Sequence, residues 1–335
     1  MAHVDTDVLD ERLAGDSLSD SPRLAIDNTD TYVKPNPSHP TRGSATEQQL
    51  AHELTTATFT FVNTLAADIS TGKFELPSWP EVIVRIQGAL ENDECSAEQL
   101  VRLIGSEPVL AARLLKVVNA DSHQDTRRPI QDLHTAVSRL GVDTVRGMAS
   151  EIATAQSRHG LDLRPVNRYL KELWHHSVHV AAIAYILAKQ FTKISPDEAR
   201  LAGLLHNIGK LYVLMRIQDN PVFIDSERTL QEIMGAWHTS IGGEIIESWN
   251  FSEELAAAVR DHELYDLTGV QSPTLTDVVS VANLLANRQN AEPGDQIELN
   301  KYPACRRLNL RTLIGVEVIR ASKAEVQELH QMLGI

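Results

Sequence analysis

Several features are scarce in this sequence, and each absence narrows what the protein can be. Only 5% of the 335 residues are aromatic, and the chain has only 2 cysteines, Cys95 and Cys305. Because these two lie far apart, we expect reduced thiols rather than a disulfide framework or a cysteine metal motif. No apolar run approaches the roughly 20 residues that a membrane-spanning helix needs, so no such helix is predicted.

Positive charge is also in short supply. The chain has 31 Lys and Arg against 45 Asp and Glu, a formal net charge of -14. This balance argues against a broad surface for nucleic acid, although Arg127-Arg128 and Arg306-Arg307 leave room for a small basic patch. The acidic start, MAHVDTDVLDERLAGD, lacks the basic and apolar regions of a secretion signal, which predicts a cytoplasmic protein.

What the sequence does have is helical periodicity. Residues 1–45 are rich in Asp, Ser, Thr and Pro and poor in large apolar residues, which predicts a disordered tail. From there on, apolar residues recur at helical spacing and strand-like alternation is nearly absent, which predicts an all-α fold. One leading helix is expected over residues 46–73, closed by Thr71-Gly72.

Capping residues mark where individual helices begin. Ser96, with Gln99 three residues later, forms a capping-box sequence. Ser195 is followed by Pro196 and two acidic residues, and we expect one helix from there through LAGLLHNIGKLYVLM. A break at Arg164-Pro165 separates two helical blocks. In the second block, LQEIMGAW and HTSIGGEIIESWN are interpreted as two separate helices.

Histidines in the second block suggest a metal site. Three lie on one predicted helix, one on the next, and two open or end later helices; these are His175, His176, His179, His206, His238 and His262. Imidazoles that project inward from several helices can assemble such a site. The pair His175 and His179 is by itself a weak zinc candidate, because it lacks the glutamate of a helical HExxH motif.

Motifs in both blocks carry a family resemblance. W-x-H-S from Trp174 to Ser177, H-N-I-G-K, H-T-S-I-G with Trp249, Asp261-His262 and VANLLA resemble an HD-superfamily phosphohydrolase lobe. The runs LPSWPEVIVRIQ, SEPVLAARLLKVVNA and RRPIQDLHTAVSRLGVDTVR resemble the HDOD domain, the HD-related output domain of bacterial signalling proteins. The resemblance covers residues 74–290.

This resemblance implies a two-lobed helical HDOD or HD-like fold. The first lobe is expected over about 74–160 and the HD-like lobe over about 165–290, preceded by the tail and the leading helix. Residues 291–335 are expected to form a C-terminal helical closure.

The resemblance also implies a set of site residues. The superfamily's metal ligands fall on His176, His206, Asn207, His238, His262 and Asn283. Catalytic members have aspartates where Asn207 and Asn283 stand, and a neutral amide oxygen cannot bridge two cations. The site is therefore predicted to be a relic that holds no metal tightly, with weak binding of a divalent metal left open.

Two of these positions have further interpretations. Asn207 can bond to His176 or His262 without any metal, because an amide both donates and accepts. Lys210 corresponds to a lysine that lies near the substrate phosphate in catalytic relatives, so it is a candidate phosphate or ligand contact. Its alternative is a lysine that extends to solvent from a half-buried helix.

Three functions stay open at this point. The first is a non-catalytic signalling module that binds partner proteins, by analogy sensor kinases or cyclic-dinucleotide enzymes. The second is a weak metal-dependent phosphohydrolase or phosphodiesterase acting on nucleotides or cyclic dinucleotides. The third is a small-molecule sensor that uses the relic cavity. Loss of both aspartates favours the first, so we expect no catalysis; the sequence identifies neither the partner, the stimulus nor the oligomeric state.

Overall fold

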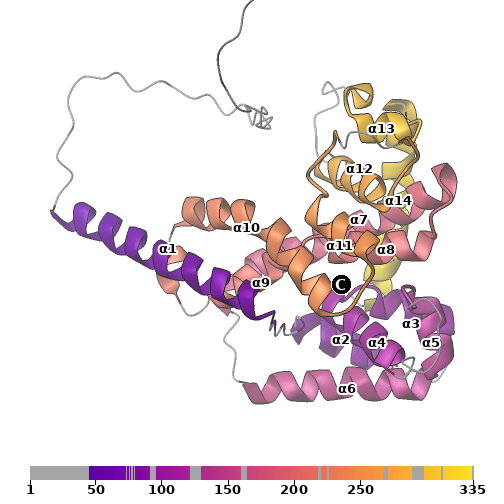
Figure 1. Cartoon of the computed structure of the whole chain (residues 1–335). Helices are drawn as coiled ribbons and strands as arrows, with labels where there is room; N and C mark the ends of the chain where they lie inside the picture. Colours follow the sequence, from indigo (N-terminus) through magenta and orange to yellow (C-terminus); the bar gives the residue numbers. More distant parts are fainter. Residues whose placement is uncertain are drawn as a thin grey trace, which may run out of the picture. The chain divides into compact units, whose positions relative to one another are not determined.

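The computed structural model describes most of the chain after residue 44 (Figure 1). Within the described residues all regular structure is helical, which confirms the all-α prediction. Residues Gln48–Ile335 form one compact unit. The structure describes residues 45–72, 74, 76, 78, 80–90, 96–120, 130–159, 164–217, 220–224, 226–266, 271–288, 298–310 and 312–333. Three features named in the sequence lie outside these ranges: residues 1–44 of the predicted tail, Cys95 and Arg127-Arg128.

The first lobe contains short helices that follow a long leading helix. That helix, α1 (Ala45–Thr71), ends as predicted at Gly72, whose φ of 62° suits a residue without a Cβ. The helix α3 (Ala97–Ile104) begins with the capping box predicted for Ser96 and Gln99. The other helices are α2 (Pro80–Leu90), α4 (Pro108–Ala120), α5 (Leu133–Leu140) and α6 (Val142–His159).

The second lobe is built around the long helix α7 (Asn167–Phe191), most of which is buried. Helix α8 (Pro196–Leu205) packs against it and is capped by Ser195 as predicted. The remaining helices are α9 (Ile208–Ile217), α10 (Glu227–Ser248), α11 (Glu253–Arg260) and α12 (Leu275–Asn287), with 3-10 turns at Arg164–Val166, Pro221–Phe223 and Leu299–Lys301.

The helix expected to run on from Ser195 is broken, so that prediction is wrong. It stops at Leu205 and resumes at Ile208. In a continuous helix the Gly203 carbonyl would accept the N–H of Asn207. Here that carbonyl accepts the ring Nδ1–H of His206, at 2.7 Å. The side chain thus competes with the helical backbone, and the chain turns where the histidine sits.

The two helices expected at LQEIMGAW and HTSIGGEIIESWN are in fact one, α10. Buried apolar residues continue along both halves of it, from Leu230 to Ile246, so one face packs on the core without interruption. As a result His238 lies in the middle of a helix rather than opening one.

The C-terminal helices tie the two lobes together. Helix α14 (Thr312–Leu333) packs along α7 and also contacts α2 and α3, while α13 (Pro303–Arg307) packs on α12. Trp174 adds a further link, because its Nε1 donates a hydrogen bond to the Ser106 carbonyl at 2.6 Å. A buried ion pair between Arg307 and Asp277 joins α13 to α12.

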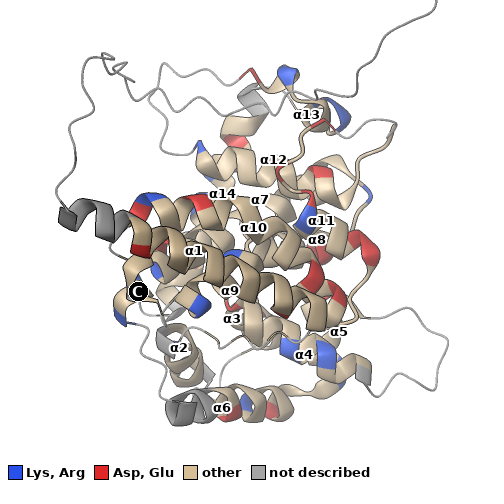
Figure 2. Ribbon diagram, turned by 60° about the vertical axis from the view of Figure 1, so that its left-hand side comes forward, with Lys and Arg blue, Asp and Glu red and all other residues tan. Residues whose placement is uncertain are grey.

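The distribution of charged residues and the state of Cys305 agree with what the composition predicts. Figure 2 shows basic and acidic residues interspersed over the described helices. No described helix is long and apolar enough to cross a membrane. Cys305 is a buried free thiol, as expected.

Candidate functional site

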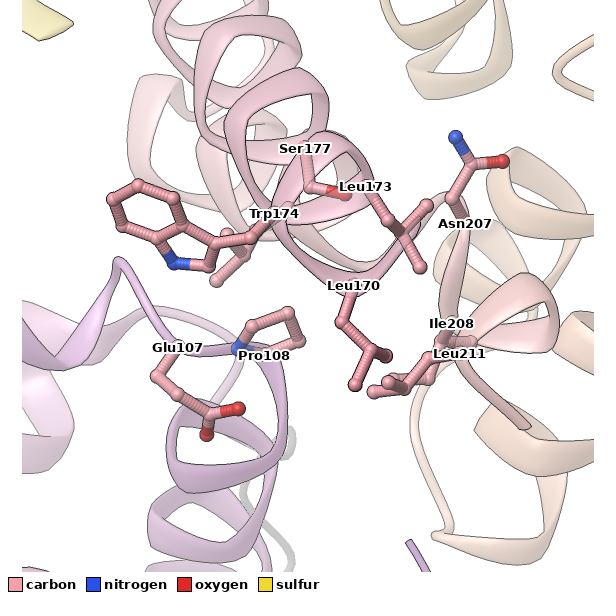
Figure 3. Close-up of a pocket in the computed structure, with 10 residues that line it drawn as sticks. Glu107, Pro108, Leu170, Leu173, Trp174, Ser177, Asn207, Ile208 and Leu211 are labelled. Carbon is pink, nitrogen blue, oxygen red and sulfur yellow. The ribbon is translucent and has the colours of Figure 1, made fainter. Parts of the chain in front are cut away.

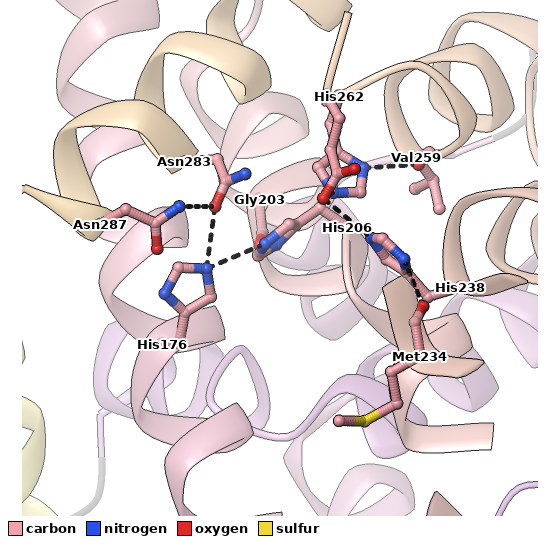
Figure 4. A network of polar contacts seen from close by, with 10 residues as sticks. His176, Gly203, His206, Met234, His238, Val259, His262, Asn283 and Asn287 are labelled. Atoms are coloured by element: carbon pink, nitrogen blue, oxygen red, sulfur yellow. Dashed lines mark hydrogen bonds and ion pairs between the residues drawn. The ribbon is translucent and has the colours of Figure 1, made fainter. Parts of the chain in front are cut away.

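Four imidazoles from four separate elements form a row in the second lobe (Figure 4). His176 comes from α7, His206 from the turn after α8, His238 from α10 and His262 from the turn after α11. Successive ring centroids are 5.2, 5.0 and 5.3 Å apart. Three of the rings are fully buried, the exception being His176. The structure thus brings together histidines that are far apart in the sequence.

Backbone carbonyls fix the orientation of the three buried rings. The Nδ1 atoms of His206, His238 and His262 lie 2.7, 2.8 and 2.7 Å from carbonyl oxygens three or four residues earlier in the chain. A carbonyl can only accept, so each Nδ1 carries the proton. In a neutral ring this leaves Nε2 with a free lone pair, which is the arrangement that metal-binding histidines use.

The first half of the row is closed by hydrogen bonds. Nε2 of His176 lies 2.9 Å from Oδ1 of Asn283 and 3.3 Å from Nε2 of His206. Because the amide oxygen and the His206 lone pair both accept, the His176 N–H serves both. Asn287 donates to the same Asn283 oxygen, at 3.3 Å. These polar atoms therefore have partners without any ion.

The second half of the row is different. Nε2 of His238 and Nε2 of His262 are buried and have no hydrogen-bond partner among the described residues. The Oε1 atom of Glu263 lies 3.3 Å from the former and 4.0 Å from the latter. These ligand atoms lie within 4.8 Å of one another. We call His238, His262 and Glu263 the half-site.

Burial and neighbouring groups shift the pKa values of the side chains in and beside the row, and these shifts set their charges. Desolvation, and next the charge of Lys210, lower the pKa of His176 to about 4. Desolvation, and next His238, lower the pKa of His262 to about 3. The nearby His238 ring lowers the pKa of Glu263 to about 2. At neutral pH His176 and His262 are therefore neutral and Glu263 is an anion.

The structure places the two remaining predicted residues at the edge of this row. Asn207 does not make the hydrogen bond to His176 or His262 that its amide allows. Its buried Oδ1 has no partner among the residues that the structure describes, and His176 bonds to Asn283 instead. Lys210 is not fully extended into solvent. Burial lowers the pKa of its ammonium, and its charge acts on Glu263 and His262.

Two histidines of the same region belong to other contacts. The ring of His175 packs against Trp174 and His330. His179 is bonded through Nε2 to the Ser322 hydroxyl on α14, at 2.9 Å. The pair His175 and His179 therefore faces different neighbours and forms no shared zinc site.

A small cavity lies where the two lobes meet, beside Asn207 (Figure 3). Pro108 of α4, Leu170 and Trp174 of α7 and Ile208 of α9 are among the residues that line it. Its volume is about 30 Å³, which holds about two water molecules. This cavity is too small for an organic ligand, so it lends no support to the small-molecule sensor.

The fold and the histidine row define a helical domain of the HD type, and comparison with known proteins identifies the family. The HDOD domain profile matches residues 76–265. The chain therefore belongs to the HDOD domain family, which confirms the resemblance seen in the sequence.

Solved structures with the same fold agree. The MmoQ response regulator of Methylococcus capsulatus has a TM-score of 0.58 at 19% identity, over 74% of this chain and 99% of that chain. A virulence factor of Campylobacter jejuni subsp. jejuni has a TM-score of 0.52 at 15% identity, over 78% of this chain and 97% of that one. At these identities the likeness establishes the fold alone.

Curated relatives are longer proteins. An uncharacterised protein of Treponema pallidum is 27% identical over 252 residues, which is 70% of this chain and 46% of the relative. Ribonuclease Y of Lawsonia intracellularis is 25% identical over 259 residues, which is 76% of this chain and 43% of the relative. The chain spans less than half the length of these relatives.

The HD superfamily implies divalent metals, and the two halves of the row fit them differently. Around His176 and His206 the anionic ligands are replaced by Asn207 and Asn283, and the imidazole nitrogens are already hydrogen-bonded. That half does not fit a cation. The half-site does fit one, since it combines two free imidazole nitrogens with a carboxylate.

Glu263 is the residue that sequence reasoning missed. It directly follows the Asp261-His262 pair, and this adjacency is the one signal that could have drawn attention to it.

Proposed function

We propose that this chain is a non-catalytic signalling module whose HD-type site does not assemble a two-metal centre. The observation that carries the proposal is the contact of His176 with both Asn283 and His206, at 2.9 and 3.3 Å. A metal on this half would have to displace both hydrogen bonds. It would gain only neutral ligands in return, which compensate a hard cation poorly.

The missing bridge supports the same conclusion. Two-metal phosphohydrolysis needs two ions about 3.5–4 Å apart that hold the attacking and the leaving oxygen. A bridging carboxylate at position 207 would bring them together, but Asn207 offers one neutral oxygen. Among the described histidines of the row, Glu263 approaches His238 and His262, which form its far half. Its carboxylate therefore does not replace the missing bridge.

We further propose that the module acts by binding partner proteins through its surface. Membership of the HDOD family and a fold shared with a response regulator support a signalling role. Sensor kinases and cyclic-dinucleotide enzymes are the candidate partners. Biolayer interferometry of the full chain with purified candidates from the same organism tests this, and a lack of association with either class would count against it.

One specific observation favours a second candidate, a metal-dependent phosphohydrolase. The Nε2 atoms of His238 and His262 have no hydrogen-bond partner within the described part of the chain, which is what free metal ligands would show. Among the relatives are enzymes named ribonuclease Y, so RNA is a substrate to include in tests.

A hydrolysis assay separates the two candidates. The wild type is supplied with manganese, iron(II) or magnesium and with generic phosphodiesters, cyclic dinucleotides and RNA. The variant Asn207→Asp/Asn283→Asp, which restores both carboxylates, is the comparison. The proposal predicts no turnover by the wild type above the metal blank. Turnover that is abolished by His206→Gln would establish the second candidate instead.

A further inference from the structure

We propose that His238, His262 and Glu263 bind one divalent transition-metal ion, with Glu263 supplying the anionic ligand that the two asparagine positions lack. The two imidazole nitrogens and the carboxylate oxygen lie within 4.8 Å of one another, close enough to share one ion. Two imidazoles and one carboxylate suit iron(II), manganese, cobalt or zinc, and they leave further coordination positions for water.

Unsatisfied lone pairs are the first argument for this ion. A buried polar atom without a partner costs free energy, and two nitrogens that have no hydrogen-bond partner among the described residues lie here within 4.8 Å of each other. The carboxylate oxygen of Glu263 approaches one of them to 3.3 Å. A lone pair and an anion repel each other unless a positive charge lies between them. A divalent cation bound at the half-site would supply it.

The second argument is that the half-site is rigid before any ion arrives. Gly209 of α9 lies against the backbone of His238, where a Cβ would come within 2.0 Å of the His238 carbonyl. Gly242 of α10 lies against the side chain of Val259, where a Cβ would come 2.8 Å from the methyl carbon Cγ1, and the carbonyl of Val259 holds the His262 ring. Close helix packing therefore fixes both imidazoles, which lowers the entropic cost of binding a cation.

Charge and access fit a single, exchangeable ion. The side chain of Glu263 is 49% exposed, so an ion can reach the half-site from solvent. One carboxylate offsets only part of a divalent charge. Lys210 opposes binding, because its ammonium acts on both Glu263 and His262. Removal of this positive charge should therefore tighten binding, a change that a merely structural role for the half-site would not produce.

This inference concerns the site of the proposed function but does not depend on it, because ion binding and turnover are measured separately. The experiment uses chelator-treated full-length chain titrated with cobalt(II), followed by isothermal calorimetry and visible absorption. We expect one ion per chain. Glu263→Gln should weaken binding by about 10-fold or more, and Lys210→Met should tighten it. His134→Gln, an exposed change on α5, is the control.

The outcomes separate the two ideas. Unchanged affinity in Glu263→Gln, or no cobalt bound by the wild type, overturns the inference. Both results leave the non-catalytic proposal intact. Conversely, hydrolysis by a wild type that holds one ion overturns the proposed function and leaves the ion site standing. Circular dichroism of each variant confirms that a lost ion does not reflect a lost fold.

Discussion

Gly209 and His238 are in such close contact that a single methyl group would not fit between their helices. A Cβ at Gly209 would lie 2.0 Å from the His238 carbonyl oxygen. The glycine of the H-N-I-G-K motif is thus explained by close helix packing. It lets α9 approach the stretch of α10 that carries one of the site imidazoles.

Gly209→Ala should therefore be strongly destabilising. The added methyl group meets backbone rather than a flexible side chain, so α9 and α10 must separate, and we expect a loss of about 3 kcal/mol or more. Denaturant unfolding measures it. Gly235→Ala is the matched control, because it lies on α10 with nothing within 4 Å of the new Cβ. That change should stabilise the protein by about 0.5–1 kcal/mol, and equal effects at both positions would contradict the packing argument.

The buried ion pair between α12 and α13 should be costly to break. Arg307 is 9% exposed and Asp277 is fully buried, and Nε of the arginine donates to the carboxylate at 2.9 Å. Arg307→Met leaves the carboxylate without its main partner and should cost about 3–5 kcal/mol. Arg260→Met removes an arginine whose side chain is 37% exposed and pairs with the solvent-accessible Glu247 and Glu253, and it should cost under about 1 kcal/mol. Urea unfolding of the two variants side by side would reveal whether burial sets the difference.

His179 should make stability depend on pH. Desolvation, and next Lys323, lower its folded-state pKa from 6.5 to about 4. Below 6.5 the unfolded chain takes up the proton more readily, so stability is retained above about 6.5 and falls as the pH drops towards about 4. His179→Gln keeps a polar partner for Ser322 and should show a shallower loss in this window. His134→Gln should follow the wild type, and thermal melts across the range compare the three.

Asn207→Asp restores the aspartate that catalytic members of the superfamily have at this position. The buried amide oxygen has no partner in the part of the chain that the structure describes, so a carboxylate there would be desolvated. Without metal the variant should melt below the wild type, because the buried charge is uncompensated. With manganese its melting temperature should rise by more than that of the wild type. A variant that melts like the wild type under both conditions would show that position 207 does not face the site.

The sequence predicts the helical class, the family and most of the histidine row, but it does not predict the turn at His206 or the carboxylate of Glu263. Capping at Ser96 and Ser195 is local chemistry and was predicted correctly. The turn at His206 was not predicted, because it depends on a hydrogen bond from the His206 ring to the Gly203 carbonyl, which a continuous helix would use for its own backbone. Glu263 was missed because its place directly after Asp261-His262 does not by itself distinguish a site carboxylate from a solvent-exposed one. Its role follows from the packing of α10 against α11.

Metal stoichiometry tests the central claim most directly. Full-length wild type is saturated with manganese, freed of excess by gel filtration, and measured by elemental analysis against protein concentration. The closed half around His176, Asn283 and His206 predicts at most one ion per chain. Two ions per chain, retained at near-stoichiometric levels, would contradict it.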